Sequence, residues 1–256
     1  MKPLALLTCT AMLAVISQAA SAIPLIRNGN FELGLGLPFW TVTDLPNGSG
    51  TWAADTDTVA GESGGGSGNV TVGPLQGQYY ALSDQFGPGT HALTQSFTVA
   101  PNATSVMLNY SMFVNSYAPF LPNDGVLDHT GMPAQFGRVD LLTGSAGAFD
   151  TGTGVLRTFY LGIDGTPISN PNPWIGYTHD ITSLVAGGGT FQLRFAETDN
   201  QLFLNMGVDM VGIEAQFGVV PEPDSLALVA LGLGGLGLAH RRPNRRRVPV
   251  VKSSSR

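Results

Sequence analysis

The chain has 256 residues, of which 12% are charged and 34 are glycine. Such low charge with so much glycine excludes a coiled coil or a mainly helical protein and favours an all-β fold. The formal net charge is −6, and seven of the twelve basic residues lie in the last sixteen positions. The acidic remainder cannot neutralise a row of phosphates, so no nucleic acid is expected as a partner.

A signal peptide is predicted for residues 1–22. Lys2 supplies the positive start, residues 4–16 form an apolar run, and Ala20-Ser21-Ala22 is a small-residue cleavage site. These features predict export. The only cysteine, Cys9, lies inside the apolar run, so the mature chain is expected to hold neither a disulfide nor a thiol nucleophile.

Residues 23–218 predict one domain built from short strands. Apolar and polar residues alternate with period two most clearly at 90–99 and 105–114, and turn residues rich in Gly, Pro and Asn separate the segments. The expected strands are 25–31, 40–43, 79–83, 90–99, 105–114, 136–142, 155–161, 175–180, 190–197 and 207–215. Short strands in this number are typical of a two-sheet β-sandwich, most often a jelly roll.

Motifs at the two ends of this domain carry a resemblance to a known fold. Residues 26–34 read IRNGNFELG, residues 193–201 read LRFAETDNQ, and residues 205–211 read NMGVDMV. Together they resemble the first and last strands of galactose-binding-like jelly rolls, the fold of many carbohydrate-binding modules. The resemblance implies that the first and last strands are neighbours and that Glu32 lies close to Asp209.

The same resemblance implies a structural calcium ion, because several such modules hold one with a glutamate of the opening motif and an aspartate of the closing strand. Glu32 and Asp209 are the corresponding carboxylates, and calcium takes about six to eight oxygen ligands. Asp209 has the same strand parity as Val211 and Ile213, so it is expected to point under the sheet edge. The alternative is that both carboxylates accept backbone N–H groups from turns.

Neutral glycans are usually bound on exposed aromatic faces with amides or carboxylates nearby. The candidate ligand-binding residues are Tyr117, Phe120, Trp174 and Tyr177. The first two belong to the segment 115–133, which joins two predicted strands and has the length of a functional loop. The sequence therefore predicts a non-catalytic β-sandwich that binds carbohydrate.

Two other functions remain open. The first is a purely structural envelope or biofilm-matrix protein with no small ligand, which the low charge favours. The second is a glycoside hydrolase or lyase, which requires two carboxylates facing one cleft. Glu197 and Asp199, on the same side of one predicted strand, are the candidate pair for that chemistry.

The C-terminal residues 219–247 predict a sorting signal. Pro221-Glu222-Pro223 precedes an apolar run. The run is followed by a cluster of arginines, Arg241, Arg242, Arg245, Arg246 and Arg247. At 1.5 Å per residue, the run 226–239 spans about 21 Å of a hydrocarbon core of roughly 30 Å. A temporary anchor is therefore favoured over a permanent helix.

This layout resembles the PEP-CTERM sorting signal of Gram-negative bacteria. The resemblance implies that the exported chain is held in the inner membrane, with its arginines inside as the positive-inside rule requires, until an exosortase releases the body to the cell surface or extracellular matrix. The expected partners are therefore the secretion machinery, the exosortase, the inner membrane during transit and, for a carbohydrate-binding domain, an extracellular polysaccharide. Residues 248–256 are expected to form a disordered tail.

Overall fold

The computed structural model describes residues 22–61, 66–162 and 170–218. The predicted signal peptide, apart from Ala22, lies outside these residues, as do the predicted sorting segment and the tail. Within the described ranges, no helix is long and apolar enough to cross a membrane.

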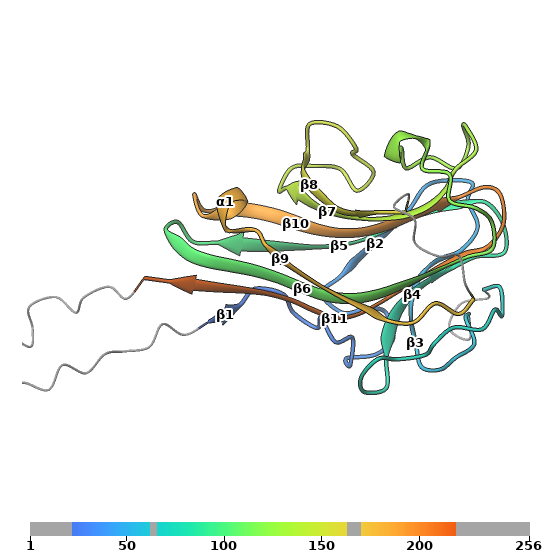
Figure 1. The fold of residues 1–256 in the computed structure, drawn as a ribbon, viewed down its shortest axis with the longest axis horizontal. Helices are drawn as coiled ribbons and strands as arrows, with labels where there is room; N and C mark the ends of the chain where they lie inside the picture. Colours follow the sequence, from blue (N-terminus) through green and yellow to red (C-terminus); the bar gives the residue numbers. More distant parts are fainter. Residues whose placement is uncertain (1–21, 62–65, 163–169, 219–256) are drawn as a thin grey trace, which may run out of the picture. The chain divides into compact units, whose positions relative to one another are not determined.

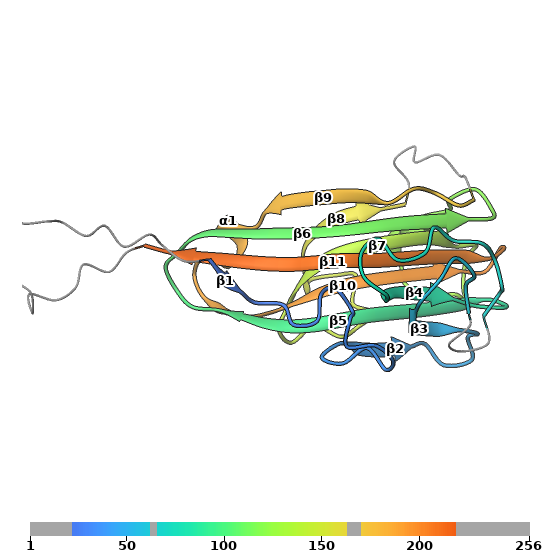
Figure 2. The ribbon, with the colours of Figure 1, turned by 90° about the horizontal axis from the view of Figure 1, so that it is seen from below.

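The body is a sandwich of two antiparallel sheets (Figures 1 and 2). The spatial order of the first sheet is β3 (Thr51–Asp55), β4 (Tyr80–Asp84), β11 (Leu204–Phe217), β6 (Ala103–Ser116) and β9 (Ile175–Asp180), with β1 (Ile23–Pro24) paired to the end of β11. The order of the second sheet is β2 (Thr41–Asp44), β5 (Gly89–Val99), β10 (Gly189–Asp199), β7 (Gln135–Thr143) and β8 (Val155–Leu161). The only helical pieces among the described residues are α1 (Thr182–Val185) and the 3-10 turn η1 (Asn123–Gly125). The predicted all-β, two-sheet sandwich is confirmed.

The strand predictions agree with most of these elements, and those for β8 and β9 have the observed bounds. The strand expected at 25–31 was wrong, since Asn28 and Phe31 have φ angles of 50° and 57°. This left-handed conformation interrupts an extended strand, so beyond β1 only single backbone hydrogen bonds, at Leu25 and Gly29, connect this segment to β11. Strand β3 was missed because its small residues Ala53 and Ala54 give no alternation. The expected neighbourhood of the first and last strands is confirmed by the pairing of Ile23 with Ala215.

The main core lies between the sheets. Leu193 and Phe195 of β10 belong to the same buried cluster as Met206 and Val208 of β11, so these side chains point into the sandwich. Strand alternation then places Glu197 and Asp199 on the inward side of β10, beyond the last apolar residue. The sandwich interior is therefore apolar along most of its length and polar where β10 ends.

A second buried polar group lies on the outer side of the second sheet. Asp140 of β7 accepts hydrogen bonds from Arg138 Nε at 2.8 Å and from Arg194 Nη2 at 2.7 Å. Arg194 also donates to the carbonyl oxygens of Ala148 and Asp150, which holds the β7–β8 connection on the sheet. Arg138 and Arg194, two of the four arginines between residues 23 and 218, thus both hydrogen-bond to the buried Asp140 carboxylate.

Candidate functional site

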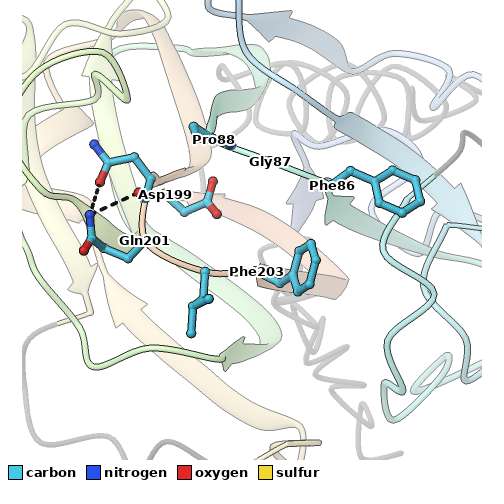
Figure 3. A pocket seen from close by; sticks show the side chains of 8 residues that line it. Phe86, Gly87, Pro88, Asp199, Gln201 and Phe203 are labelled. Carbon is cyan, nitrogen blue, oxygen red and sulfur yellow. Dashed lines mark hydrogen bonds between the residues drawn. The ribbon is translucent and has the colours of Figure 1, made fainter.

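A cleft of about 220 Å³ opens at the end of the sandwich where β10 turns into β11 (Figure 3). One wall is the turn Phe86–Pro88, which leads from β4 into β5. The other wall is Asp199–Phe203, between β10 and β11. Phe86 is 63% exposed, and Leu202 on the other wall is 55% exposed, so both walls offer apolar surface.

The wall that carries Phe86 is held from behind by the loop 45–50. Ser49 Oγ accepts the backbone N–H groups of Phe86 at 3.1 Å and Gly87 at 3.2 Å, and Ser49 N–H donates to the Pro88 carbonyl at 2.9 Å. The Ser49 carbonyl accepts a hydrogen bond from His91 Nε2 at 2.8 Å, while His91 Nδ1 bonds to Asp44 Oδ1 at 2.7 Å. A chain of hydrogen bonds therefore runs from β2 to the cleft wall.

Where the loop 45–50 packs against the start of β5, Gly50 and Gly89 have no room for a side chain. A Cβ atom on Gly89 would lie 2.3 Å from His91 Nε2 and 2.5 Å from the Ser49 carbonyl oxygen. Gly50 has a φ angle of +89°, and its Cβ would lie 2.3 Å from the Asp84 carbonyl oxygen. Glycine is required at both positions because the two loops pack backbone to backbone.

The polar wall is built around Asp199. Its Oδ1 accepts the Gly89 N–H at 3.1 Å, which ties the two walls of the cleft together. Burial raises the pKa of Asp199 to about 7, although hydrogen bonds from Gln85 and Gly89 oppose the shift. Asp199 therefore changes its charge near neutral pH.

Glu197, two residues earlier, is completely buried. Neither of its carboxyl oxygens has a hydrogen-bond partner among the described residues, and His91 Nε2 lies 3.9 Å from Oε1. Burial raises the pKa of Glu197 well above its usual value, and the carboxylates of Asp199, Asp84 and Asp44 raise it further. Glu197 does not line the cleft, so the pair predicted from the sequence is divided between the cleft and the interior.

The four aromatic residues predicted to bind ligand lie at separate places. Tyr117 is beside the cleft, where its ring meets that of Phe203 edge-on at 6.2 Å. Phe120 packs against the core beneath its loop, and Tyr177 stacks on a core tyrosine. Trp174 packs against Tyr80 and Phe113 on the outer side of the first sheet.

The aromatic residues of the cleft itself, Phe86 and Phe203, were not singled out from the sequence. The available signal was their position, because each belongs to a short polar segment between two predicted strands. Apolar residues in such connections are exposed unless another segment covers them.

Glu32 and Asp209 both contact the segment 75–79. The resemblance implied that these two residues lie close together. Asp209 Oδ2 accepts the backbone N–H groups of Leu75 at 3.2 Å and Gln76 at 3.1 Å. Glu32 Oε1 accepts those of Gln78 and Tyr79, each at 2.9 Å. The two carboxylates therefore anchor the segment that precedes β4.

This donor set does not fit a calcium ion. The groups facing both carboxylates are amide hydrogens, which repel a cation, and Asp209 Oδ1 accepts a further N–H from Met210. In the described part of the chain, no three His, Cys, Asp or Glu residues are grouped to hold a metal. The hydrogen bonds instead match the alternative to a calcium site, in which Glu32 and Asp209 accept backbone N–H groups from a turn.

The orientation expected for Asp209 was wrong. Met210 has a φ angle of 54°, and the β11–β6 register shifts between Asp209 and Gly212. This bulge inserts an extra residue, so Asp209 lies on the opposite face of β11 from Val208 and Ile213. The bulge directs the carboxylate toward the 75–79 segment instead of the core.

Comparison with known proteins identifies the C-terminal segment. Residues 219–246 match the family model described as the PEP-CTERM protein-sorting motif. The predicted sorting signal is thus confirmed, and the motif marks an exported, surface-directed protein that is a target of exosortase. No curated protein matches the sequence.

Solved structures with a similar fold have low sequence identity to this chain. A Stig cyclase from Fischerella sp. TAU has 15% identity and a TM-score of 0.46, with 76% of this chain and 98% of that chain covered. TmCBM61, solved in complex with β-1,4-galactotriose, has 9% identity and a TM-score of 0.42, with 75% and 97% covered. The K1 cleaved adhesin domain of Lys-gingipain from Porphyromonas gingivalis W83 has 12% identity and a TM-score of 0.39, with 78% and 99% covered.

Proposed function

We propose that the protein is an exosortase-sorted component of the cell surface or extracellular matrix whose β-sandwich binds carbohydrate without catalysis. The sorting motif at 219–246 supports the first part of this proposal. The second part rests on one observation, the exposed Phe86 at the mouth of a cleft that is also lined by Phe203 and by the polar residues Asp199 and Gln201.

The chemistry of the cleft suits a sugar. Phe86 and Phe203 offer the apolar surface on which the C–H face of a sugar ring packs. Near these rings, the side-chain amide of Gln201 and the carboxyl group of Asp199 are available as partners for hydroxyl groups (Figure 3). The Asn200 amide group is already bonded to the carbonyl oxygens of His129 and Met132. The volume is below the roughly 300 Å³ at which drug-sized sites begin, so the cleft matches about one sugar unit of a longer chain.

The fold also presents the cleft away from the attachment point. The cleft wall at 199–203 immediately precedes β11, and Gly218 immediately follows it. The fourteen residues of β11 separate the two by roughly 45 Å at about 3.3 Å per residue. β1 pairs with the last part of β11, so both ends of the body leave from the end opposite the cleft (Figures 1 and 2).

The positions of the carboxylates favour binding over hydrolysis. Glycoside hydrolases need two carboxyl groups that face the same cleft, about 5 to 9.5 Å apart. Asp199 lines the cleft, whereas Glu197 is fully buried and directed into the sandwich. This leaves one carboxyl group of the predicted pair for a sugar to contact.

Retention of the full chain, kept in mild detergent, on insoluble polysaccharides tests the binding proposal. We expect Phe86→Ala and Phe203→Ala to reduce retention at least fivefold. Phe39→Ala is the matched control, because Phe39 is also exposed but does not line the cleft. If no polysaccharide retains the unmodified chain, the structural-matrix alternative replaces carbohydrate binding.

Mass spectrometry of the mature protein from its native host tests the sorting proposal. We expect the surface-localised form to begin near Ile23 and to end between Pro221 and Asp224. A surface-localised form that retains Arg241 to Arg247 would contradict removal of the sorting signal.

A further inference from the structure

Among the described residues, no arginine or lysine side chain lines the cleft. Between residues 23 and 218 the chain has four arginines and no lysine. Arg138 and Arg194 are bonded to Asp140, while Arg27 lies 3.5 Å over the Phe39 ring and Arg157 lies 5.7 Å over the Phe159 ring. These four side chains contribute nothing to the cleft lining.

The carboxyl groups, by contrast, gather at this end of the sandwich. Asp199 lines the cleft, and Glu197 lies behind it on the same side of β10. The charges of Asp84, Asp44 and Asp199 act on Glu197, and His91 Nε2 lies 3.9 Å from its Oε1. Asp199, whose pKa is about 7, attracts a cationic ligand and repels an anionic one in its ionised form.

The apolar wall adds a second preference for positive charge. The face of an aromatic ring carries negative charge density, so an ammonium group within about 6 Å of the ring centre is attracted to it. Figure 3 shows the Asp199 carboxyl group between Gln201 and the rings of Phe86 and Phe203. Gln201 Nε2 donates to Asn200 Oδ1 at 2.8 Å, which holds the polar turn in place.

We propose that the cleft selects a saccharide with a free amino group, such as a glucosamine unit of a de-N-acetylated polysaccharide. The ammonium group pairs with Asp199 and contacts the Phe86 and Phe203 faces, while the Gln201 side chain contacts the hydroxyl groups. An N-acetyl group removes the positive charge, and a carboxylate on the sugar reverses it. The selectivity rests on the proposed carbohydrate binding at this cleft.

Calorimetric titration of the full chain at pH 7 with three trisaccharides tests this selectivity. The probes are the β-1,4-linked trimers of glucosamine, N-acetylglucosamine and glucose. We expect the glucosamine trimer to bind at least tenfold more tightly than the other two, and the preference to decrease as salt screens the charges. Asp199→Asn should reduce the preference to less than threefold.

Asp199 is buried, so its variant is compared with Phe86→Leu and Phe203→Leu, which keep an apolar wall but remove the aromatic face. These variants should retain the unmodified melting temperature and lose part of the preference for glucosamine. Equal binding of all three trimers, or an unchanged preference in folded Asp199→Asn, would overturn the ammonium site and leave carbohydrate binding intact. Absence of binding to every trimer and every polysaccharide would overturn both.

Discussion

Ser49 Oγ lies 3.1 Å from the backbone nitrogen of Phe86, thirty-seven residues later in the chain, and accepts its N–H. The same oxygen accepts the Gly87 N–H at 3.2 Å. Ser49 does not line the cleft, so its hydroxyl group acts on ligand only by positioning the wall that carries Phe86.

Removal of this hydroxyl group in Ser49→Ala should free both amides. We expect faster hydrogen exchange at Phe86 and Gly87 and several-fold weaker retention on polysaccharide, because the wall is no longer held in one conformation. Ser145→Ala, at an exposed turn, is the control. Unchanged exchange at both amides would show that Ser49 does not hold the wall, whether or not the cleft binds sugar.

The buried Asp140 should be the most sensitive charged position in the body. Asp140→Asn leaves Arg138 and Arg194 without their shared carboxylate, and such a loss typically costs about 3 to 5 kcal/mol. Chemical unfolding measures the difference against Glu214→Gln, an exposed change expected to stay within about 0.5 kcal/mol. A loss below about 1 kcal/mol would mean that the arginines find other partners.

Stability should decrease as the pH rises from about 4 to about 8. Burial raises the pKa of Asp199 to about 7 and that of Asp209 to about 6, so the folded state holds these protons after the unfolded chain has released them. The free energy of unfolding therefore falls with pH across the window between the unfolded value, about 3.9, and the raised values. Thermal scans at successive pH values should show this decline, and Asp199→Asn should flatten it. A melting temperature that rises from pH 5 to pH 7.5 would refute the argument.

The 75–79 segment offers a test of the calcium ion implied by the resemblance. Because amide hydrogens face Glu32 and Asp209, we expect the same melting temperature with chelator and with millimolar calcium. Gly77→Ala should lower the melting temperature in both conditions, because Gly77 has a φ angle of +74° and its Cβ would lie 2.4 Å from Glu32 Oε1. A rise of several degrees in calcium alone would instead support an ion held by the two carboxylates.

Much of the fold is predictable from local pattern. The strands of the second sheet and most of those of the first were located by alternation, because a strand with one face buried must place apolar residues at every second position. The sorting signal was equally readable, since it depends on a short motif, an apolar length and a charge cluster in linear order. The neighbourhood of β1 and β11 was predicted from the resemblance and not from the pattern.

The cleft and the direction of its side chains depend on contacts between distant segments. Its walls come from 86–88 and 199–203, and they are joined by the contact between Gly89 and Asp199. The bulge at Met210 turns Asp209 to the face opposite the one its parity predicted. The sequence by itself determined most of the strands and the sorting motif, because those depend on neighbours in the chain. Only the tertiary structure decided which carboxyl group lines the cleft and which segment each one contacts, because a single inserted residue or a turn packed from elsewhere changes the face to which a side chain points.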